Sequence, residues 1–145
     1  MEGAVVKVDT RPLKFWLDEL ERRGRNLKEV NKNLAAIMVE MVDENFATQG
    51  HGEWPPLAAS TLARRRAGGE GAQILQDTGR LAASISLGHT EVTDRVVEVY
   101  TNVKYAKYHV SREPRKKIPL RDFLKIDMPE FLDQATEVLV SEITG

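Results

Sequence analysis

The sequence contains no cysteine, and its formal net charge at pH 7 is only −1. Without cysteine, the chain can form neither a disulfide nor a thiolate zinc site. The small net charge argues against a general polyanion-binding surface. No apolar run approaches the ~20 residues of a transmembrane helix, and the first residues lack the pattern of a secretory signal. We therefore expect a globular cytoplasmic protein with no membrane partner.

Recognisable catalytic and metal-binding patterns are also missing. The three histidines, His51, His89 and His109, lie far apart and form no metal-ligand spacing. The glycines of AGGEGA at 67–72 are not followed by the lysine and hydroxyl residue of a phosphate-binding loop. Carboxylates are plentiful, but their spacing nominates no acid and base. We predict no catalytic residue, no metal and no cofactor, and therefore a protein that is not an enzyme.

The strongest periodic signal is a long helix that follows Asn26. Its apolar residues recur at steps of three and four, which is typical of one buried helix face. They are Leu27, Val30, Leu34, Ile37, Met38, Met41, Val42 and Phe46. Asn26 is expected to cap this helix, and Gly24 to separate it from a shorter helical run capped by Thr10, with Pro12 in its first turn. A methionine and aromatic stripe also suits a partner groove, but we interpret it as core.

β-Strands are predicted at the N-terminus and in the second half of the chain. The β-branched run at 4–8 indicates an edge strand. Segments 84–92 and 95–101 indicate a hairpin that turns at Thr93 and Asp94. The alternating apolar residues of this hairpin are Ile85, Leu87, Val97 and Val99.

Shorter elements complete the pattern. Residues 57–66 favour a short helix and residues 76–83 a helical turn, whereas 105–110 fits either a strand or a helical turn. A last helix begins at Asp127, with Pro129 in its first turn. Its apolar stripe comprises Phe131, Leu132, Ala135, Val138, Leu139 and Ile143.

The fold class follows from these elements. We expect a single α+β domain over residues 1–145. In it, a long N-terminal helical segment and a C-terminal helix pack on a small, mostly antiparallel β-sheet.

Charged residues are segregated along the chain. The basic clusters are Arg64, Arg65 and Arg66, and then Arg112, Arg115, Lys116 and Lys117. The C-terminal end is acidic, with Asp127, Glu130, Asp133, Glu137 and Glu142 and no basic residue from 126 to 145. Opposite charges on separate surfaces favour head-to-tail contact between copies, which closes into a ring. The basic clusters also suit contact with nucleic-acid phosphates, which is the alternative.

Two segments have a clear local interpretation. Trp54 precedes two prolines, so its backbone is extended, and its indole beside a glycine loop is expected to close the end of the core, with a partner contact as the alternative. Thr78 and Gly79 predict a turn that leads into Leu81.

The segment before the last helix has the sequence IPLRDFL at 118–124. Phe123 and Leu124 are expected to anchor the chain there. Arg121 is expected to reach a nearby carboxylate or backbone carbonyl, or else an interface.

Taken in order, several motifs resemble the virion morphogenesis family of tailed bacteriophages. They are NF at 45–46, G-x-W-x-P-L at 52–57, Thr61 and the arginines after it, ILQDTGRL at 74–81, SI at 84–85, YAxxH at 105–109 and IPLRDFL at 118–124. The positions that carry the resemblance are Trp54, Pro56, Leu57, Thr61, Thr78, Gly79, Leu81, Tyr105, Ala106, His109, Pro119, Arg121, Phe123 and Leu124.

The resemblance implies a structural protein of a phage or prophage that completes the tail so that the tail can join the head. The implied partners are further copies of the chain and the tail-tube, terminator or neck proteins. The implied location is the host bacterial cytoplasm during assembly and then the virion, at the tail or the head–tail junction. A nucleic-acid-binding module that uses the two basic clusters is the rival function.

Overall fold

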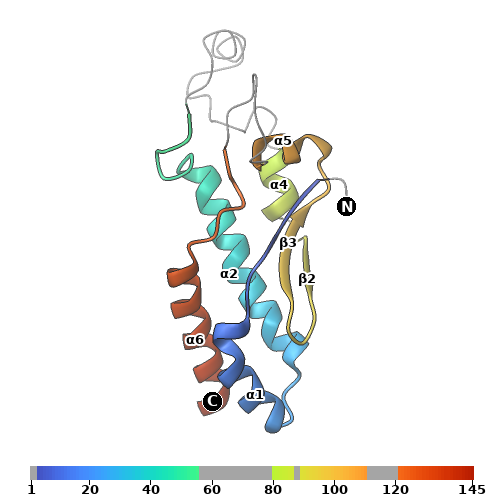
Figure 1. The fold of residues 1–145 in the computed structure, drawn as a ribbon, viewed down its shortest axis with the longest axis vertical. Helices are drawn as coiled ribbons and strands as arrows, with labels where there is room; N and C mark the ends of the chain where they lie inside the picture. The colour runs from blue at the N-terminus through green and yellow to red at the C-terminus, as the bar shows by residue number, and fades with distance from the viewer. Residues whose placement is uncertain (1–2, 56–79, 87–88, 111–120) are drawn as a thin grey trace.

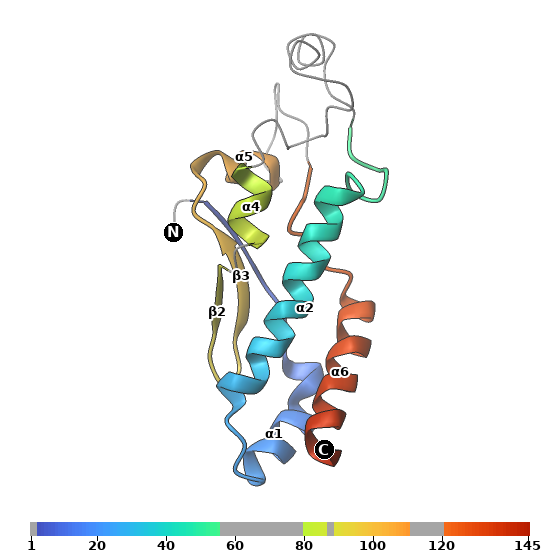
Figure 2. The ribbon, with the colours of Figure 1, turned by 180° about the vertical axis from the view of Figure 1, so that it is seen from behind.

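The computed structural model describes residues 3–55, 80–86, 89–110 and 121–145. Its elements in chain order are β1 (Ala4–Lys7), the 3₁₀ turn η1 (Arg11–Leu13), α1 (Lys14–Arg22), α2 (Leu27–Ala47), α4 (Arg80–Ser86), β2 (Thr90–Val92), β3 (Val97–Thr101), the 3₁₀ turn η2 (Lys104–Ala106), α5 (Lys107–Val110) and α6 (Met128–Thr144). Helix α2 runs through the centre, with the sheet and α4 on one side and α6 on the other (Figure 1, Figure 2). The predicted α+β class is confirmed.

Helix α2 is the longest element, and its ends follow from its sequence. The side-chain oxygen of Asn26 accepts hydrogen bonds from the backbone N–H groups of Lys28 and Glu29, at 3.0 and 3.4 Å, which confirms the predicted cap. All eight apolar residues of the predicted stripe are buried. The interpretation of this stripe as core is therefore confirmed.

The N-terminal helical run begins differently from the prediction. Thr10 does not cap it, because its backbone is already helical and its hydroxyl donates to the backbone carbonyl of Arg95 at 2.8 Å. The turn η1, which contains Pro12, lies between Thr10 and α1. The Thr10 side chain thus ties the start of this run to the β-hairpin.

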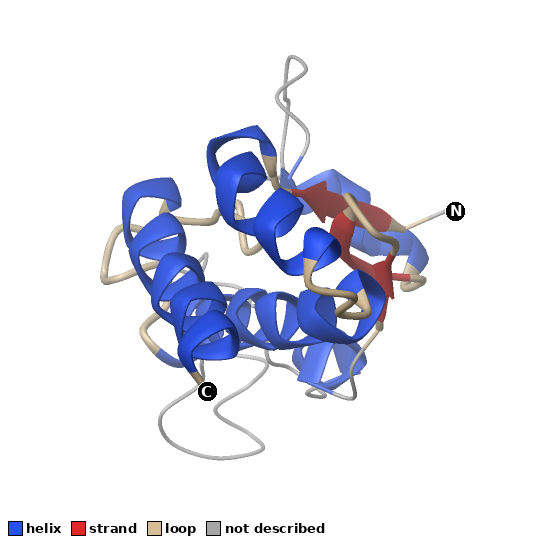
Figure 3. Ribbon diagram, turned by 90° about the horizontal axis from the view of Figure 1, so that it is seen from below, coloured by secondary structure: helices blue, strands red, loops and turns tan. Residues whose placement is uncertain are grey.

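The three strands form an antiparallel sheet in the order β1, β3, β2. Val6 lies opposite Val99, and Val92 lies opposite Val97. Both edge strands pair with β3, and the backbone N–H of Thr93 donates to the carbonyl of Val96 at 2.9 Å in the connecting turn. The predicted edge strand and hairpin turn are confirmed. Seen along the long axis, the strands lie at one side of the helices (Figure 3).

The prediction of one strand over 84–92 is wrong. Residues Ser84–Ser86 belong to α4, and only Thr90–Val92 form a strand. Leu81 and Ile85 are buried, and their spacing of four places them on one face of a helix that contacts α2. Ile85 thus follows a helical pattern, although its alternation with Leu87 in the sequence indicated a strand. Residue 87, like segments 57–66 and 76–79, lies outside the described residues.

The remaining elements are helical. Segment 105–110, which the sequence left open, forms η2 and α5. Helix α6 begins as predicted, since a carboxylate oxygen of Asp127 accepts from the N–H of Glu130 at 3.2 Å. It packs against α1 and α2, and Arg25 pairs with Glu142 near its end. None of the described helices is long and apolar enough to cross a bilayer.

A buried asparagine joins α2 to the hairpin turn. Asn31 is 0 % exposed, and its side-chain amide donates to the carbonyls of Thr93 and Asp94, at 2.9 Å each. Because a buried amide needs hydrogen-bond partners, these two bonds fix where the hairpin lies on α2.

Replacing this amide is expected to weaken the fold. Asn31→Ala removes two hydrogen bonds that hold the hairpin turn on α2, which should cost about 1–3 kcal/mol in the free energy of unfolding. The neighbouring Asn33 is exposed, so Asn33→Ala should cost less than about 0.5 kcal/mol. Urea denaturation of the two variants compares these costs. Equal losses would contradict the role of Asn31.

A second test uses the charges of α1. Hydrogen bonds from Arg22 and then Arg23 lower the pKa of Glu19 from 4.5 to about 2. Because folding lowers this pKa, the carboxylate stabilises the fold above pH ~4.5 and loses this contribution as the pH falls toward ~2. The difference in unfolding free energy between wild type and Glu19→Gln should therefore shrink over that range in urea titrations. A difference independent of pH would refute the assignment.

Candidate functional site

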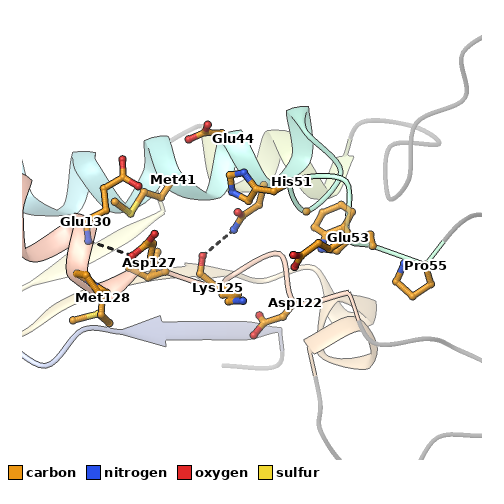
Figure 4. Close-up of a pocket in the computed structure, with 15 residues that line it drawn as sticks. Met41, Glu44, His51, Glu53, Pro55, Asp122, Lys125, Asp127, Met128 and Glu130 are labelled. Atoms are coloured by element: carbon orange, nitrogen blue, oxygen red, sulfur yellow. Dashed lines mark hydrogen bonds between the residues drawn. The ribbon is translucent and has the colours of Figure 1, made fainter.

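Three segments meet at the C-terminal end of α2. They are the last turn of the helix, the loop that follows it to Pro55, and the segment 121–130 that runs alongside (Figure 4). The side-chain amide of Asn45 donates to the carbonyls of Phe123 and Lys125, at 2.8 and 2.9 Å. A single buried side chain therefore holds the segment before α6 against α2.

The loop after α2 makes an unusual left-handed turn. Gln49, Gly50, His51 and Gly52 have φ angles of 53°, 70°, 57° and 78°. Side chains at such angles cost roughly 1–2 kcal/mol each outside glycine, and strained backbone of this kind is concentrated at functional sites. The turn brings the chain back toward α2, where the N–H of Trp54 donates to the carbonyl of Gln49 at 3.2 Å.

The turn places the Trp54 indole over the end of the core. The ring of Trp54 meets that of Phe46 edge-to-face, with centroids 5.9 Å apart, and Phe46 packs on Phe123 at 5.3 Å. Such aromatic contacts add stability beyond the area that they bury. A Cβ atom at Gly50 would lie only 2.1 Å from the indole. Glycine at this position thus allows the indole to lie flat against the loop.

Arg121 locks the loop to the rest of the site. Its side chain is 7 % exposed, and its Nε and Nη2 atoms donate to the carbonyl of Pro55 at 3.0 and 2.8 Å. The backbone N–H of Arg121 also donates to the carbonyl of His109 at 2.9 Å. Of the expected partners of Arg121, the structure thus shows a backbone carbonyl. Arg121 connects the Trp54 loop, α5 and the segment that leads to α6.

The other sequence-predicted positions fall into two groups. Leu81, Ala106, Phe123 and Leu124 are buried in the core. Tyr105 is exposed, and its ring meets that of His109 edge-to-face at 6.4 Å. The positions outside the described residues are Pro56, Leu57, Thr61, Arg64, Arg65, Arg66, Thr78, Gly79, Arg112, Arg115, Lys116, Lys117 and Pro119.

A groove of about 710 Å³ opens between the three segments, and we call it the acidic groove. Its apolar side chains are those of Met41, Trp54, Pro55, Ile126, Met128 and Pro129. Its carboxylates are Glu44, Glu53, Asp122, Asp127 and Glu130, while Lys125 is its one cationic lysine or arginine among the described residues. The sequence analysis identified Asp127 and Glu130 but missed the other three, because the groove forms only when distant segments meet.

The groove suits binding. Among the described residues, no group of three or more carboxylate or imidazole side chains is arranged to hold a metal ion. Its lining combines apolar side chains with carboxylates, which match a basic segment with some apolar character. We therefore interpret the end of α2 as a docking surface.

The Trp54 contact predicts a difference between two glycines. Gly50→Ala adds a methyl group against the indole and a strained φ, whereas Gly52→Ala adds only the strain, because nothing lies within 4 Å. Gly52→Ala should cost about 1 kcal/mol and Gly50→Ala about 2–4 kcal/mol, since forced overpacking adds to the strain. Trp54 emission in a Trp16→Phe background should shift to the red only for Gly50→Ala. Identical stability and spectra would contradict this packing.

Comparisons with known proteins agree with the motif reading. A model of the phage virion morphogenesis family matches residues 8–137, which include α1, α2, the strands β2 and β3, the acidic groove and most of α6. No curated protein and no solved structure gave a match. Because the family model covers most of the chain, this protein belongs to the phage virion morphogenesis family.

Proposed function

We propose that this protein acts in tail completion and head–tail joining, as a ring-forming oligomer. Family membership establishes the coarser role, which is virion morphogenesis. The finer role is supported by the end of α2, where family-motif residues from distant segments converge beside an exposed groove instead of surrounding a reactive centre. In this role the chain supplies contacts and performs no bond chemistry.

The observation that carries the proposal is a stripe of exposed charge on α6. Asp127, Glu130, Asp133 and Glu137 are exposed and follow one another at helical spacing, so they continue the acidic groove along one helix face. Among the described residues, no lysine or arginine pairs with any of the four. Unneutralised charge on one face favours a partner with a basic surface.

Copies of the chain itself are the first such partners. A contact between two different surfaces of identical subunits repeats around an axis and closes into a ring when its rotation allows. Tail-tube, terminator and neck proteins are the proposed further partners. The proposed location is the host cytoplasm during assembly and then the head-proximal end of the tail.

The test is electron microscopy of particles made without this protein. We expect separate full heads and unjoined tails, and restoration of joined particles when the wild-type gene is supplied in trans. Restoration is the control that the defect comes from this protein. Normal infectious particles in its absence would end the proposal.

A further inference from the structure

We propose that the acidic groove binds the basic segment 112–117 of a second copy of the chain. This inference rests on the proposed self-association and assigns the two surfaces that make it. The groove provides one surface, at the end of α2, and a neighbouring copy provides the other.

The shape of the groove suits a short peptide segment. Met41 of α2 and Met128 of α6 both line the groove, and the loop of Glu53 and Pro55 lies at its other end (Figure 4). A volume of about 710 Å³ lies within the ~300–1,000 Å³ range of pockets that enclose compact ligands. Flexible methionine side chains adapt to irregular partners, including the alkyl stems of lysine and arginine. The apolar side chains of the groove can therefore pack on the alkyl stems of lysine and arginine, while its carboxylates pair with their cationic groups.

Four carboxylates of the groove are not neutralised by the described part of the chain. Glu44, Glu53, Asp127 and Glu130 have no ion pair with any described lysine or arginine. Most described arginines already have partners elsewhere. Arg11, Arg22, Arg23, Arg25 and Arg95 pair with carboxylates of the helical end and the hairpin. Apart from Lys125, a cation for these four carboxylates must come from a segment outside the described residues or from another molecule.

The sequence contains a matching segment. Residues 112–117 read REPRKK, with four basic residues and one acidic residue, and Ile118, Pro119 and Leu120 follow directly. Basic residues next to apolar ones reproduce the two properties of the groove. The other basic cluster, at 64–66, has only three arginines, and Leu62 is the one large apolar residue beside it before a glycine-rich stretch begins. Charge and apolar character together favour segment 112–117.

Paired variants test the contact in the full-length chain. The groove variant carries Glu44→Lys and Glu53→Lys, two exposed positions whose carboxylates form no ion pair with a described residue. The segment variant carries Arg115→Gln, Lys116→Gln and Lys117→Gln, which remove the charge of the segment without making it complementary to the reversed groove. A control carries Glu91→Lys and Asp94→Lys, which make the same charge change at exposed hairpin positions. Circular dichroism and thermal unfolding verify that all of them fold.

Sedimentation velocity in about 50 mM salt, where screening is weak, measures assembly. Wild type and control should form oligomers that dissociate as salt rises, and each variant alone should stay monomeric. A mixture of the two variants should give dimers and nothing larger, because only one intact groove meets one intact segment. This outcome follows only if the contact is heterologous and between copies.

Other outcomes overturn the inference. Variants that assemble like wild type would show that these charges are not at the interface. A mixture that stays monomeric would show that the segment engages its own groove or that another molecule occupies it. A monomeric wild type would refute the contact, while unjoined heads and tails in particles without the protein would leave the morphogenesis role intact.

Discussion

The burial of α2 is the constraint on which the rest of the structure depends. Its apolar stripe is covered by the sheet, α4, α1 and α6, so each of these elements must align with one helix. Apolar contacts alone do not fix the position of each element along the axis of α2. Two buried amides fix this position by hydrogen bonds, since Asn31 holds the hairpin turn and Asn45 holds the segment before α6.

The docking surface is a consequence of this alignment. Asn45 brings segment 121–130 beside the helix, and Arg121 brings the Trp54 loop onto it through the carbonyl of Pro55. The loop reaches this position through a left-handed turn with positive φ angles. The carboxylates of three segments then surround one apolar groove, and α6 extends the same charge along its exposed face. In the proposed function, these features form the surface that contacts other subunits.

The sequence predicted what local chemistry determines. The caps at Asn26 and Asp127 and the buried stripe of α2 follow from hydrogen-bonding and periodicity within a few residues, and all are present. Predictions failed where tertiary contacts decided the outcome. The Thr10 hydroxyl bonds a distant carbonyl instead of a cap, and Ile85 lies on a helix because it packs against α2. The groove could not be predicted from the sequence for the same reason, since the segments that line it are far apart in the chain.

We propose that the end of α2 is an assembly surface of the virion. Cryo-electron microscopy of complete particles would show this surface in place. We expect a ring of copies at the head-proximal end of the tail, with the acidic groove of each copy covered by its neighbour. Particles without this protein, or copies whose grooves are open to solvent, would contradict it.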